Sequence, residues 1–319
     1  MQDAVPSRAL HWARQVLGPG ARITKVERLP LGGWHINHRL TVLDTRGLSH
    51  MVVLRRWARP GWEIDDPDYT AAREAHVLGL LAPTSVPAPH LVAADPDGTS
   101  CGVPALLLSC LPGHPPSSAA PADATLCREL AQALAQIHAV GAAGQQDVPG
   151  YRLYYDRLQP APPGWLPHQP IWQHAARIIQ AAPPEPEPTL IHRDFHPENT
   201  LWSRQRLTGV VDWTQASWGP AALDLGHLRW NLVLDHGLAV ADELLRCYDA
   251  LTGSAADQPY WDLVAVFDLL LAGDPADPGD LDADDQHRLT SYVEELTARH
   301  DDPRPRGRQA RSTADPVPG

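Results

Sequence analysis

The sequence predicts an α+β protein of two lobes, in which a small antiparallel sheet comes first and a larger helical lobe follows. Over the first hundred residues, short runs alternate apolar and polar side chains, as strands do when one face is buried. Beyond residues 111–113, apolar residues recur at helical spacing. The chain of 319 residues is long enough for two domains. We expect a small lobe over residues 1–109, a helical lobe over 110–300, and a disordered tail rich in Pro, Arg and Asp over 301–319.

The small lobe is expected to contain five strands and one helix. Residues 51–54, Met-Val-Val-Leu, form the most apolar run, which ends in Arg55 and Arg56. Apolar side chains of residues 68–81 share one face of a helix, and the proline-rich run 83–89 ends it. The expected strands are residues 21–29, 35–43, 50–57, 91–94 and 103–110.

The helical lobe begins with a helix that Asp123 is expected to cap and that reaches residue 140. Residues 201–211 form two short apolar strands around a polar turn at Gln205 and Arg206. Proline-rich residues 160–170 are expected to be a loop. Further helices are expected at residues 171–181, near 223–251, at 260–271 and at 284–300.

The composition argues against several classes of protein. A net charge of −12 disfavours a protein that binds duplex nucleic acid, which would need a basic face. The sequence contains no run of about 18 apolar residues and no basic-then-apolar signal pattern at its start, so we expect no membrane span. The four cysteines form no C-x-x-C pair, which is typical of free thiols in a reducing compartment. These features favour a cytoplasmic protein.

The strongest functional signal lies between residues 191 and 213. It contains Asp194, then Asn199 five residues later and Asp212 thirteen residues after that. The hairpin expected between the last two would return Asp212 beside Asn199, and both beside Asp194. One carboxylate could accept a proton, while the carboxamide and the other carboxylate offer oxygen ligands to a hard divalent cation. The complete spacing favours a site for phosphoryl transfer.

These residues resemble the H-R-D-x-x-x-x-N element of protein-kinase-like enzymes, with Asp212 in the place of the later metal-binding acid. His196-Pro197 after the first acid, Asp212-Trp213, and the run Gly-Pro-Ala-Ala-Leu-Asp that ends at Asp224 make the chain similar to the aminoglycoside phosphotransferase and choline kinase family. The resemblance covers roughly residues 22–300. It implies a bilobal protein-kinase-like fold and transfer of the γ-phosphate of ATP, with Mg²⁺, to a hydroxyl of an aminoglycoside-like compound or another small metabolite or antibiotic.

The resemblance also implies roles for individual residues. Asp194 would accept the proton of the acceptor hydroxyl, and Asn199 and Asp212 would bind Mg²⁺. The remaining residues would support the catalytic loop: His192, Arg193 and Asp224.

Arg55 stands where protein kinases carry the lysine that holds the α- and β-phosphates. Lys25 is the only lysine of the chain, so the usual strand offers no lysine clamp. Arginine keeps the charge and can bind phosphate through two nitrogens. Glu74 in the next helix is expected to orient it, whereas strand alternation turns Arg56 to the opposite face.

Gly32 and Gly33, with Asn37 after them, are candidates for a loop over the phosphates, because glycine lets backbone N–H groups approach an anion. The run lacks the full G-x-G-x-x-G pattern, and two adjacent glycines are also typical of an ordinary hairpin turn. Ser109 and Leu111 are expected at the hinge between the lobes, facing the adenine, from their order along the chain alone.

The acceptor is expected against the helical lobe, and two chemistries remain open for it. Six aspartates between residues 274 and 285 could attract a polyamine, or could form only a solvated loop before a helix. Four tryptophans could line an apolar pocket for a macrolide-like acceptor, or could belong to the core: Trp165, Trp172, Trp218 and Trp230.

Two other classes of protein compete with the kinase hypothesis. A metal hydrolase could be built on His192, Asp194 and His196, but no second ligand motif accompanies them. A catalytically silent nucleotide-binding protein is suggested by the exchange of lysine for Arg55, whereas the presence of all three polar site residues argues against it. Phosphoryl transfer that requires Mg²⁺ would separate the three.

Overall fold

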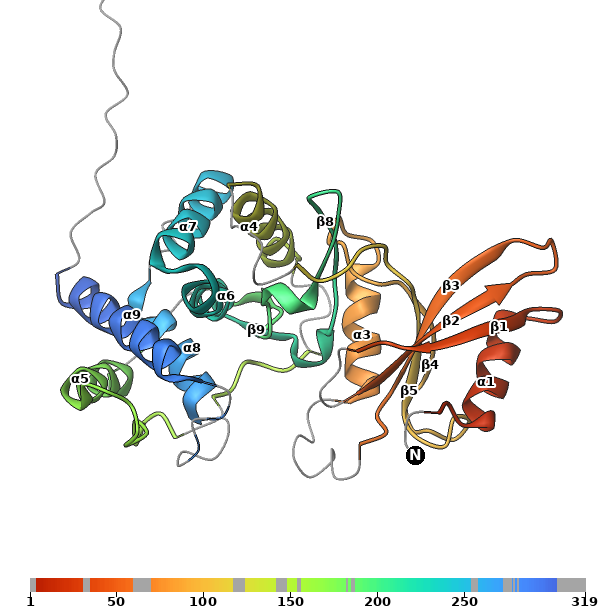
Figure 1. Ribbon diagram of the computed structural model, residues 1–319, viewed down its shortest axis with the longest axis horizontal. Helices are drawn as coiled ribbons and strands as arrows, with labels where there is room; N and C mark the ends of the chain where they lie inside the picture. The colour runs from red at the N-terminus through yellow and green to blue at the C-terminus, as the bar shows by residue number, and fades with distance from the viewer. Residues whose placement is uncertain are drawn as a thin grey trace, which may run out of the picture.

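The computed structural model describes residues 4–30, 35–59, 70–116, 124–141, 148–153, 156–181, 183–184, 187–253, 258–271, 277, 279 and 281–302. Two lobes lie side by side, a sheet lobe and a helical lobe, with the β7–β8 hairpin and helix α3 where they meet (Figure 1). The α+β, bilobal prediction is therefore confirmed.

The small lobe contains a five-stranded antiparallel sheet in the order β1-β2-β3-β5-β4. All five strands were predicted, each within two residues of its bounds. The elements of this lobe are α1 (Ser7–Leu17), β1 (Arg22–Arg28), β2 (Ile36–Leu43), β3 (Ser49–Arg56), α3 (Ala71–Leu81), β4 (Leu91–Asp95) and β5 (Ala105–Ser109).

Side chains of β3 and β5 alternate between two helices that cover opposite faces of the sheet. Val52 and Leu54 pack in one cluster with α1, whereas Val53 and Leu106 pack with the cluster that contains α3. Because Arg55 follows this alternation, it shares the α3 face of the sheet.

Helix α1 was not predicted. Its buried residues are Ala9, Trp12 and Ala13, spaced as one narrow helical stripe. Leu10, Val16 and Leu17 also pack against their cluster, so the helix is amphipathic and its apolar spacing could have been read from the sequence. The stripe covers the sheet face that holds Leu40, Leu54 and Leu107.

Helix α3 begins at Thr70, whose hydroxyl accepts a hydrogen bond of 3.2 Å from the backbone N–H of Arg73. This is the ordinary N-cap contact, and it satisfies a donor that the first turn leaves unpaired. The buried stripe of the helix includes one charged residue, Glu74, which is 1% exposed. The helix thus delivers a carboxylate to the interior at the lobe boundary.

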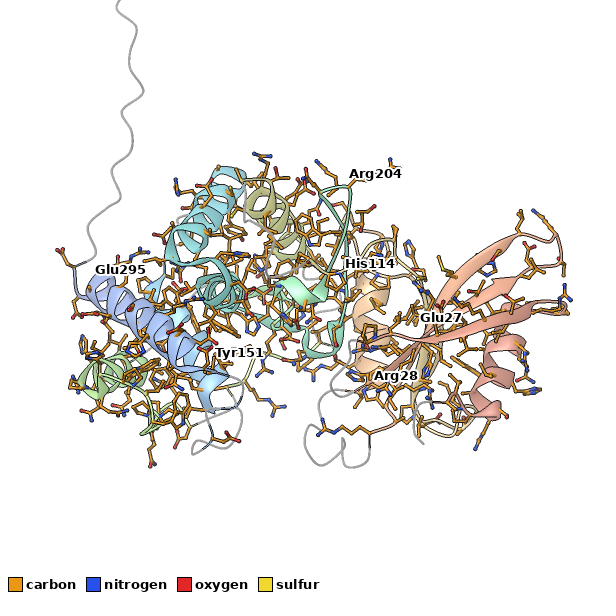
Figure 2. The ribbon with its side chains drawn as sticks, viewed as in Figure 1. Glu27, Arg28, His114, Tyr151, Arg204 and Glu295 are labelled. Carbon is orange, nitrogen blue, oxygen red and sulfur yellow. The ribbon has the colours of Figure 1, made fainter. Side chains whose placement is uncertain are left out.

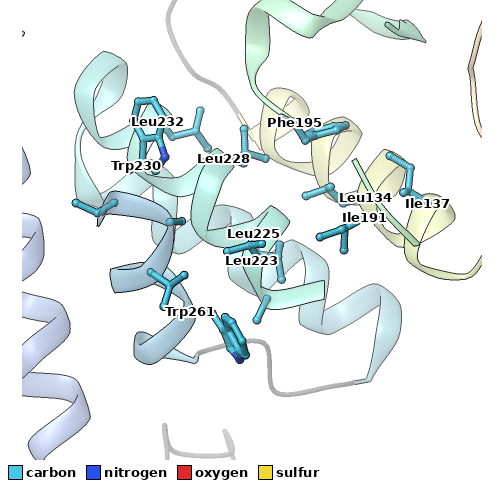
Figure 3. Close-up of a cluster of buried hydrophobic side chains, with 14 of the residues drawn as sticks. Leu134, Ile137, Ile191, Phe195, Leu223, Leu225, Leu228, Trp230, Leu232 and Trp261 are labelled. Carbon is cyan, nitrogen blue, oxygen red and sulfur yellow. The ribbon is translucent and has the colours of Figure 1, made fainter. Parts of the chain in front are cut away.

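The helical lobe packs around α6 (Ala221–His236). Leu223, Leu225 and Leu228 of α6 face Ile191 and residues of α4 in one buried cluster (Figure 3). The helices that contact α6 are α4 (Ala124–His138), α7 (Leu238–Thr252), α8 (Pro259–Leu271) and α9 (Ala283–Asp301), and α5 (Gln169–Gln180) packs against α8 and α9. The expected cap at Asp123 lies outside the described residues.

Two short pairs of strands flank the loop that carries Asp194. The hairpin of β7 (Thr200–Ser203) and β8 (Arg206–Val210) was predicted, but its turn lies at Arg204 and Gln205, one residue earlier than expected. Arg206 already pairs with Ser203, and both turn residues have positive φ, as tight hairpin turns require. The pair of β6 (Thr189–Ile191) and β9 (Ser217–Gly219) was not predicted.

The four cysteines are free thiols, of which Cys101 and Cys127 are buried. Among the described residues, no helix is both long and apolar enough to cross a bilayer.

Candidate active site

The loop after β6 is held by the buried carboxylate of Asp224, at the start of α6. Its oxygens accept hydrogen bonds from the backbone N–H groups of His192 (2.7 Å) and Arg193 (2.6 Å), and His138 lies 3.2 Å away. Burial opposes ionisation of Asp224, but the hydrogen bond and charge of His138 outweigh it and hold the pKa below its usual value. These contacts stabilise Arg193 in a left-handed conformation, with φ of 70°. Asp224 therefore fixes the backbone conformation of the loop that carries Asp194.

His192 and Asn199 connect this loop to the hairpin. The His192 ring nitrogen Nε2 lies 3.0 Å from the carbonyl oxygen of Val211, beside Asp212. The backbone N–H of Val211 donates to the carbonyl of Asn199 at 2.9 Å. These two contacts hold Val211, and with it the next residue, Asp212, beside Asn199. The predicted hairpin led to the same arrangement.

The carboxamide of Asn199 orients Asp194. Its Nδ2 donates to Asp194 Oδ2 at 3.0 Å and to the Asp194 carbonyl oxygen at 2.9 Å. The Asp194 side chain remains 29% exposed, and its other oxygen, Oδ1, makes no hydrogen bond with Asn199.

Arg55 contacts two carboxylates, Glu74 of its own lobe and Asp212 of the helical lobe. Its Nε donates to Glu74 Oε2 at 2.8 Å, and its Nη2 forms an ion pair with Asp212 Oδ1. Thr214 also donates its hydroxyl to Asp212 Oδ1, and His35 Nδ1 lies 2.9 Å from Arg55 Nη2. The guanidinium is 5% exposed, so these contacts fix its position.

The two carboxylates that contact Arg55 respond differently to burial. Burial raises the pKa of Glu74 to about 7, although the charge of Arg55 opposes this shift. Burial acts in the same direction on Asp212, but there the charge of Arg55 and the hydrogen bond from Thr214 prevail, so its pKa falls below the usual value. Asp212 is therefore ionised at physiological pH.

A cleft between the lobes collects most of the predicted residues. Its apolar walls include Val53, Leu108 and Leu201. The predicted site residues that line it are Asn37, Arg55, Glu74, Ser109, Leu111, Asn199 and Asp212. Gly32 and Gly33 lie outside the described residues.

The other two basic candidates lie elsewhere. Arg56 is 3% exposed and lies among residues of the α1 face, as strand alternation predicted; its Nε and Nη2 find no hydrogen-bond partner among the described residues. Lys25 lies on β1, where its exposed ammonium pairs with Glu27 at 2.7 Å.

Sequence reasoning missed one neighbour of Asp194, His227. His227 Nε2 lies 3.5 Å and His196 Nε2 lies 3.8 Å from Asp194 Oδ1. Burial lowers the pKa of His227 to about 4 although Asp194 opposes this, so the ring is neutral at physiological pH. Its place one helical turn after Asp224 is the sequence signal that could have found it, because both then share a face of α6.

The donor set suits Mg²⁺. Both hydrogen bonds of Asn199 Nδ2 go to Asp194. The side-chain carbonyl oxygen of Asn199 therefore points away from Asp194. In the described part of the site, the contacts of Asp212 with Arg55 and Thr214 all reach Oδ1, so Oδ2 remains for a cation. Mg²⁺ commonly takes one or two protein oxygens and completes its shell with phosphate and water. No group of three or more His, Cys, Asp or Glu that could hold a metal occurs among the described residues, contrary to what a metal hydrolase would need.

A family model described as "Phosphotransferase enzyme family" matches residues 29–264. No curated protein matches the chain. The fold is shared with a Ralstonia eutropha JMP134 protein provisionally assigned as an aminoglycoside phosphotransferase, with a TM-score of 0.64 and 18% identity over 92% of this chain and 97% of that one.

Two further structures have the same fold. One is a thermostable mutant of aminoglycoside phosphotransferase APH(4)-Ia in a ternary complex with ADP and hygromycin B, with a TM-score of 0.59 and 15% identity over 92% of this chain and 98% of that one. The other is macrolide 2'-phosphotransferase MphH from Brachybacterium faecium, with a TM-score of 0.56 and 20% identity over 84% of this chain and 92% of that one. At these identities the likeness concerns the fold alone.

Proposed function

The chain belongs to the phosphotransferase enzyme family, and on that premise we propose that this small-molecule kinase transfers the γ-phosphate of ATP to a hydroxyl of its acceptor with the help of Mg²⁺. One observation carries the proposal. Asn199 and Asp212 face the same cleft as Arg55 and Glu74, and Asn199 is bonded to Asp194. These contacts support the assignment of a proton acceptor, two oxygen ligands and a phosphate clamp to one place.

Asp194 acts on the acceptor. Its Oδ2 is held by Asn199, so Oδ1 accepts a hydrogen bond from the acceptor hydroxyl, orients the oxygen towards the γ-phosphorus and takes its proton as the bond to phosphorus forms. Most of the rate enhancement then comes from orientation and charge neutralisation, as is general for phosphoryl transfer.

Arg55 acts on the nucleotide. Glu74 and Asp212 hold the guanidinium at the cleft, where it can donate to the α- and β-phosphates without losing rotamer freedom on binding. Ser109 and Leu111 line the same cleft at the end of β5. We therefore assign the lobe boundary to residues 109–110, the adenine position to this hinge, and residues 1–109 to the nucleotide-binding lobe.

Asn199 and Asp212 would hold the metal through the carboxamide oxygen and carboxylate Oδ2. Bound Mg²⁺ would neutralise charge on the transferring phosphate. His192 and Asp224 support these residues from outside the reacting centre, through the contacts to Val211 and to the loop backbone. A reaction that consumes ATP suits the cytoplasm, where we propose that the protein acts.

The test is ADP release by the purified chain with Mg²⁺ and a panel of hydroxylated compounds, with and without chelator. Asp194→Asn should retain nucleotide binding and lose about 10²–10⁴-fold in turnover, the usual contribution of a general base. Glu243→Gln, which removes an acid that pairs with Arg246 on α7, is the control and should remain active. Full activity without a divalent ion, or an unimpaired Asp194→Asn, would contradict the proposal; nucleotide binding without transfer by the unmodified chain would favour the silent alternative.

A further inference from the structure

The side chain of Asp194 is bonded to Asn199 through one oxygen, and its other oxygen, Oδ1, faces two imidazoles. His227 Nε2 lies 3.5 Å from Oδ1, and His196 Nε2 lies 3.8 Å from it. His196 belongs to the loop itself, two residues after Asp194, whereas His227 belongs to α6. Each carboxylate oxygen has two lone pairs, so Oδ1 can accept one hydrogen bond from the protein and a second one from the acceptor hydroxyl.

The backbone of the loop is fixed by contacts within the helical lobe. Asp224 accepts two backbone N–H groups of the loop. The guanidinium of Arg193 lies over the ring of Tyr151 at 5.0 Å and donates to the carbonyl oxygen of Arg152 at 2.7 Å, and Tyr151 lies within the helical lobe (Figure 2). These contacts hold the backbone next to Asp194, but they do not set the orientation of its carboxylate.

His227 is placed by the same helix that fixes this backbone. It follows Asp224 by three positions on α6, so the two side chains project from one face of the helix. Most of α6 is buried, and a packed helix positions a side chain more firmly than a loop does. Helix α6 therefore presents a carboxylate to the backbone of the loop and an imidazole to the side chain of Asp194.

The ring of His227 packs against Trp230. The two rings meet edge to face, with 5.1 Å between their centroids and an angle of 73° between their planes. Trp230 is buried in the main core with Trp172 and Trp218, and Trp165 packs against that core. The four tryptophans considered from the sequence thus contribute to the core, and one of them limits the rotation of the His227 ring.

The ring of His227 is neutral at physiological pH, because burial lowers its pKa to about 4. An imidazole with so low a pKa is a poor proton acceptor at neutral pH, so it is not suited to be the base itself. A neutral imidazole has one N–H, and a carboxylate can only accept hydrogen bonds. The nitrogen that faces Asp194, Nε2, is therefore the one that carries the hydrogen.

The largest charge effects on the pKa of His227 come from residues of the loop and of α6, and not from the aspartates before α9. Where those aspartates are described, they have partners in their own segment. Asp282 caps α9 by accepting from the backbone N–H of Asp285 at 2.9 Å, and Asp277 accepts from the N–H of Gly279 at 3.0 Å. Two of the six lie outside the described residues: Asp274 and Asp280.

We propose that His227 is a positioning residue for the transfer reaction, whose Nε2–H donates to Asp194 Oδ1 while Asn199 holds Oδ2. This inference rests on the proposed function, because it concerns the base of that same reaction. The separation of 3.5 Å exceeds that of an ordinary hydrogen bond, about 2.7–3.2 Å, and catalytic contacts often tighten only when the substrate binds. With both oxygens held, the carboxylate keeps one orientation, and a lone pair of Oδ1 remains for the acceptor hydroxyl.

The experiment compares two substitutions of His227 in the full chain. His227→Leu removes the N–H and keeps an apolar contact with Trp230, whereas His227→Gln retains an N–H near the position of Nε2. His11→Gln is the control, because His11 is exposed on α1, which covers the sheet face opposite the cleft. ADP release with Mg²⁺ and ATP gives kcat and the KM for ATP, with water as the acceptor in one series and hygromycin B in another.

His227→Leu should lower kcat by about 10- to 100-fold, as on the loss of one hydrogen bond to a charged group. It should leave the KM for ATP unchanged, since His227 does not line the nucleotide cleft. His227→Gln should retain most of the activity, and His11→Gln all of it. In an Asp194→Ala background, His227→Leu should cause no further loss, because no carboxylate remains to be oriented.

Full kcat in His227→Leu, equal losses in His227→Leu and His227→Gln, or a further loss in the Asp194→Ala background would overturn the inference. Nitrogen NMR of the histidine-labelled chain at neutral pH gives a readout that does not need turnover. We expect the His227 hydrogen on Nε2, protected from exchange with water, and loss of that protection in Asp194→Ala. A hydrogen on Nδ1 would overturn the inference, whereas the expected signal without ADP release from the unmodified chain would overturn the proposed function and leave the contact standing.

Discussion

The guanidinium of Arg55 lies between Glu74 of α3 and Asp212 after β8, two residues that come from different lobes. Arg56, its neighbour in β3, is equally buried but faces α1 and does not line the cleft. The two arginines therefore form a matched pair in which only the direction of the side chain differs.

Arg55→Met should raise the KM for ATP and lower kcat, with a loss of a few kcal/mol in kcat/KM, because it deletes a charge-assisted contact to phosphate. Arg55→Lys should recover part of the loss, since an ammonium carries the charge but not the planar fork. Arg56→Met should leave ATP kinetics nearly unchanged. Steady-state ATP kinetics of the three variants test the assignment, and damage by Arg56→Met with a silent Arg55→Met would reverse it.

Glu74 should make the stability of the chain depend on pH. Its pKa is raised from 4.5 to about 7 in the folded state, so the folded protein binds a proton more tightly than the unfolded one. The resulting stabilisation is complete below pH 4.5 and is lost as the pH rises through about 7. The side chain at position 74 cannot ionise in the Glu74→Gln variant. The free energy of unfolding of this variant, relative to that of the unmodified chain, should therefore rise by roughly 2 kcal/mol between pH 5 and 8.

Urea unfolding at pH 5 and 8, without nucleotide, measures this difference. If Arg55 keeps Glu74 ionised from pH 5 to 8, the free energies of unfolding of the unmodified chain and of Glu74→Gln will change by the same amount. That outcome would show that the pKa of Glu74 is not raised. Glu243→Gln, which changes an acid on α7 well outside the cleft, is the control for the loss of one charge.

At the scale of secondary structure, Gly226 sets the closest approach between helices α6 and α8. A Cβ at this position would lie 2.9 Å from the Cα of Asp262 and 3.0 Å from the carbonyl oxygen of Trp261. Backbone atoms cannot move aside as a flexible side chain can. The absence of a side chain is thus a packing requirement of this helix pair.

Gly226→Ala should destabilise the fold by about 1–3 kcal/mol, the usual cost of overpacking. Gly79→Ala is the control, because Gly79 is also helical but a Cβ there would meet nothing within 4 Å. That change should stabilise α3 by about 0.5–1 kcal/mol through the higher helix propensity of alanine. Thermal and urea unfolding compare the two; equal effects would show that the α6–α8 contact can relax.

The elements that could be predicted are those with a strong local period. The strand 51–54 and the helix that contains Leu130 and Leu134 carry enough apolar side chains to show alternation or helical spacing. Helix α1 carries such a period as well, with Ala9, Trp12 and Ala13 buried and Leu10 and Val16 packed beside them, so it could have been predicted and was missed. Strands β6 and β9, of three residues each, are too short to show a period of two.

The site was predictable to the extent that its residues are close in sequence. Spacing brought Asp194, Asn199 and Asp212 together, and alternation gave Arg55 its direction. The ion pair between Arg55 and Asp212 joins residues 157 positions apart, and the approach of His227 to Asp194 depends on how α6 packs against the loop. No local pattern records such contacts, because tertiary packing decides them.

Across the whole molecule, two carboxylates of the cleft, Glu74 and Asp212, contact the guanidinium of Arg55. Mg²⁺ together with a non-transferable nucleotide such as AMP-PNP should therefore raise the melting temperature by on the order of 5 °C at 100-fold excess over Kd. The reason is that the metal–nucleotide complex binds to both lobes of the folded protein and does not bind to the unfolded chain.

Mg²⁺ by itself should raise the melting temperature much less, since it supplies no phosphate to Arg55. Asp212→Asn should abolish the dependence of nucleotide binding on the metal, because it removes the formal charge that faces the cation. Thermal unfolding with each component singly and together provides the comparison; equal shifts with and without Mg²⁺ would contradict the assignment of Asn199 and Asp212 as metal ligands.

The position of Lys25 on β1, paired with Glu27 and apart from the residues that line the cleft, has a practical consequence for chemical labelling. Acylating reagents attack amines, whereas a guanidinium stays protonated and unreactive. A nucleotide that carries an acyl phosphate, designed to mark the clamp lysine of a kinase, would find no amine among the described residues of this cleft. An amine-reactive dye would instead attach to one lysine on the outer strand of the small lobe, and so would report on lobe motion while leaving the nucleotide position untouched.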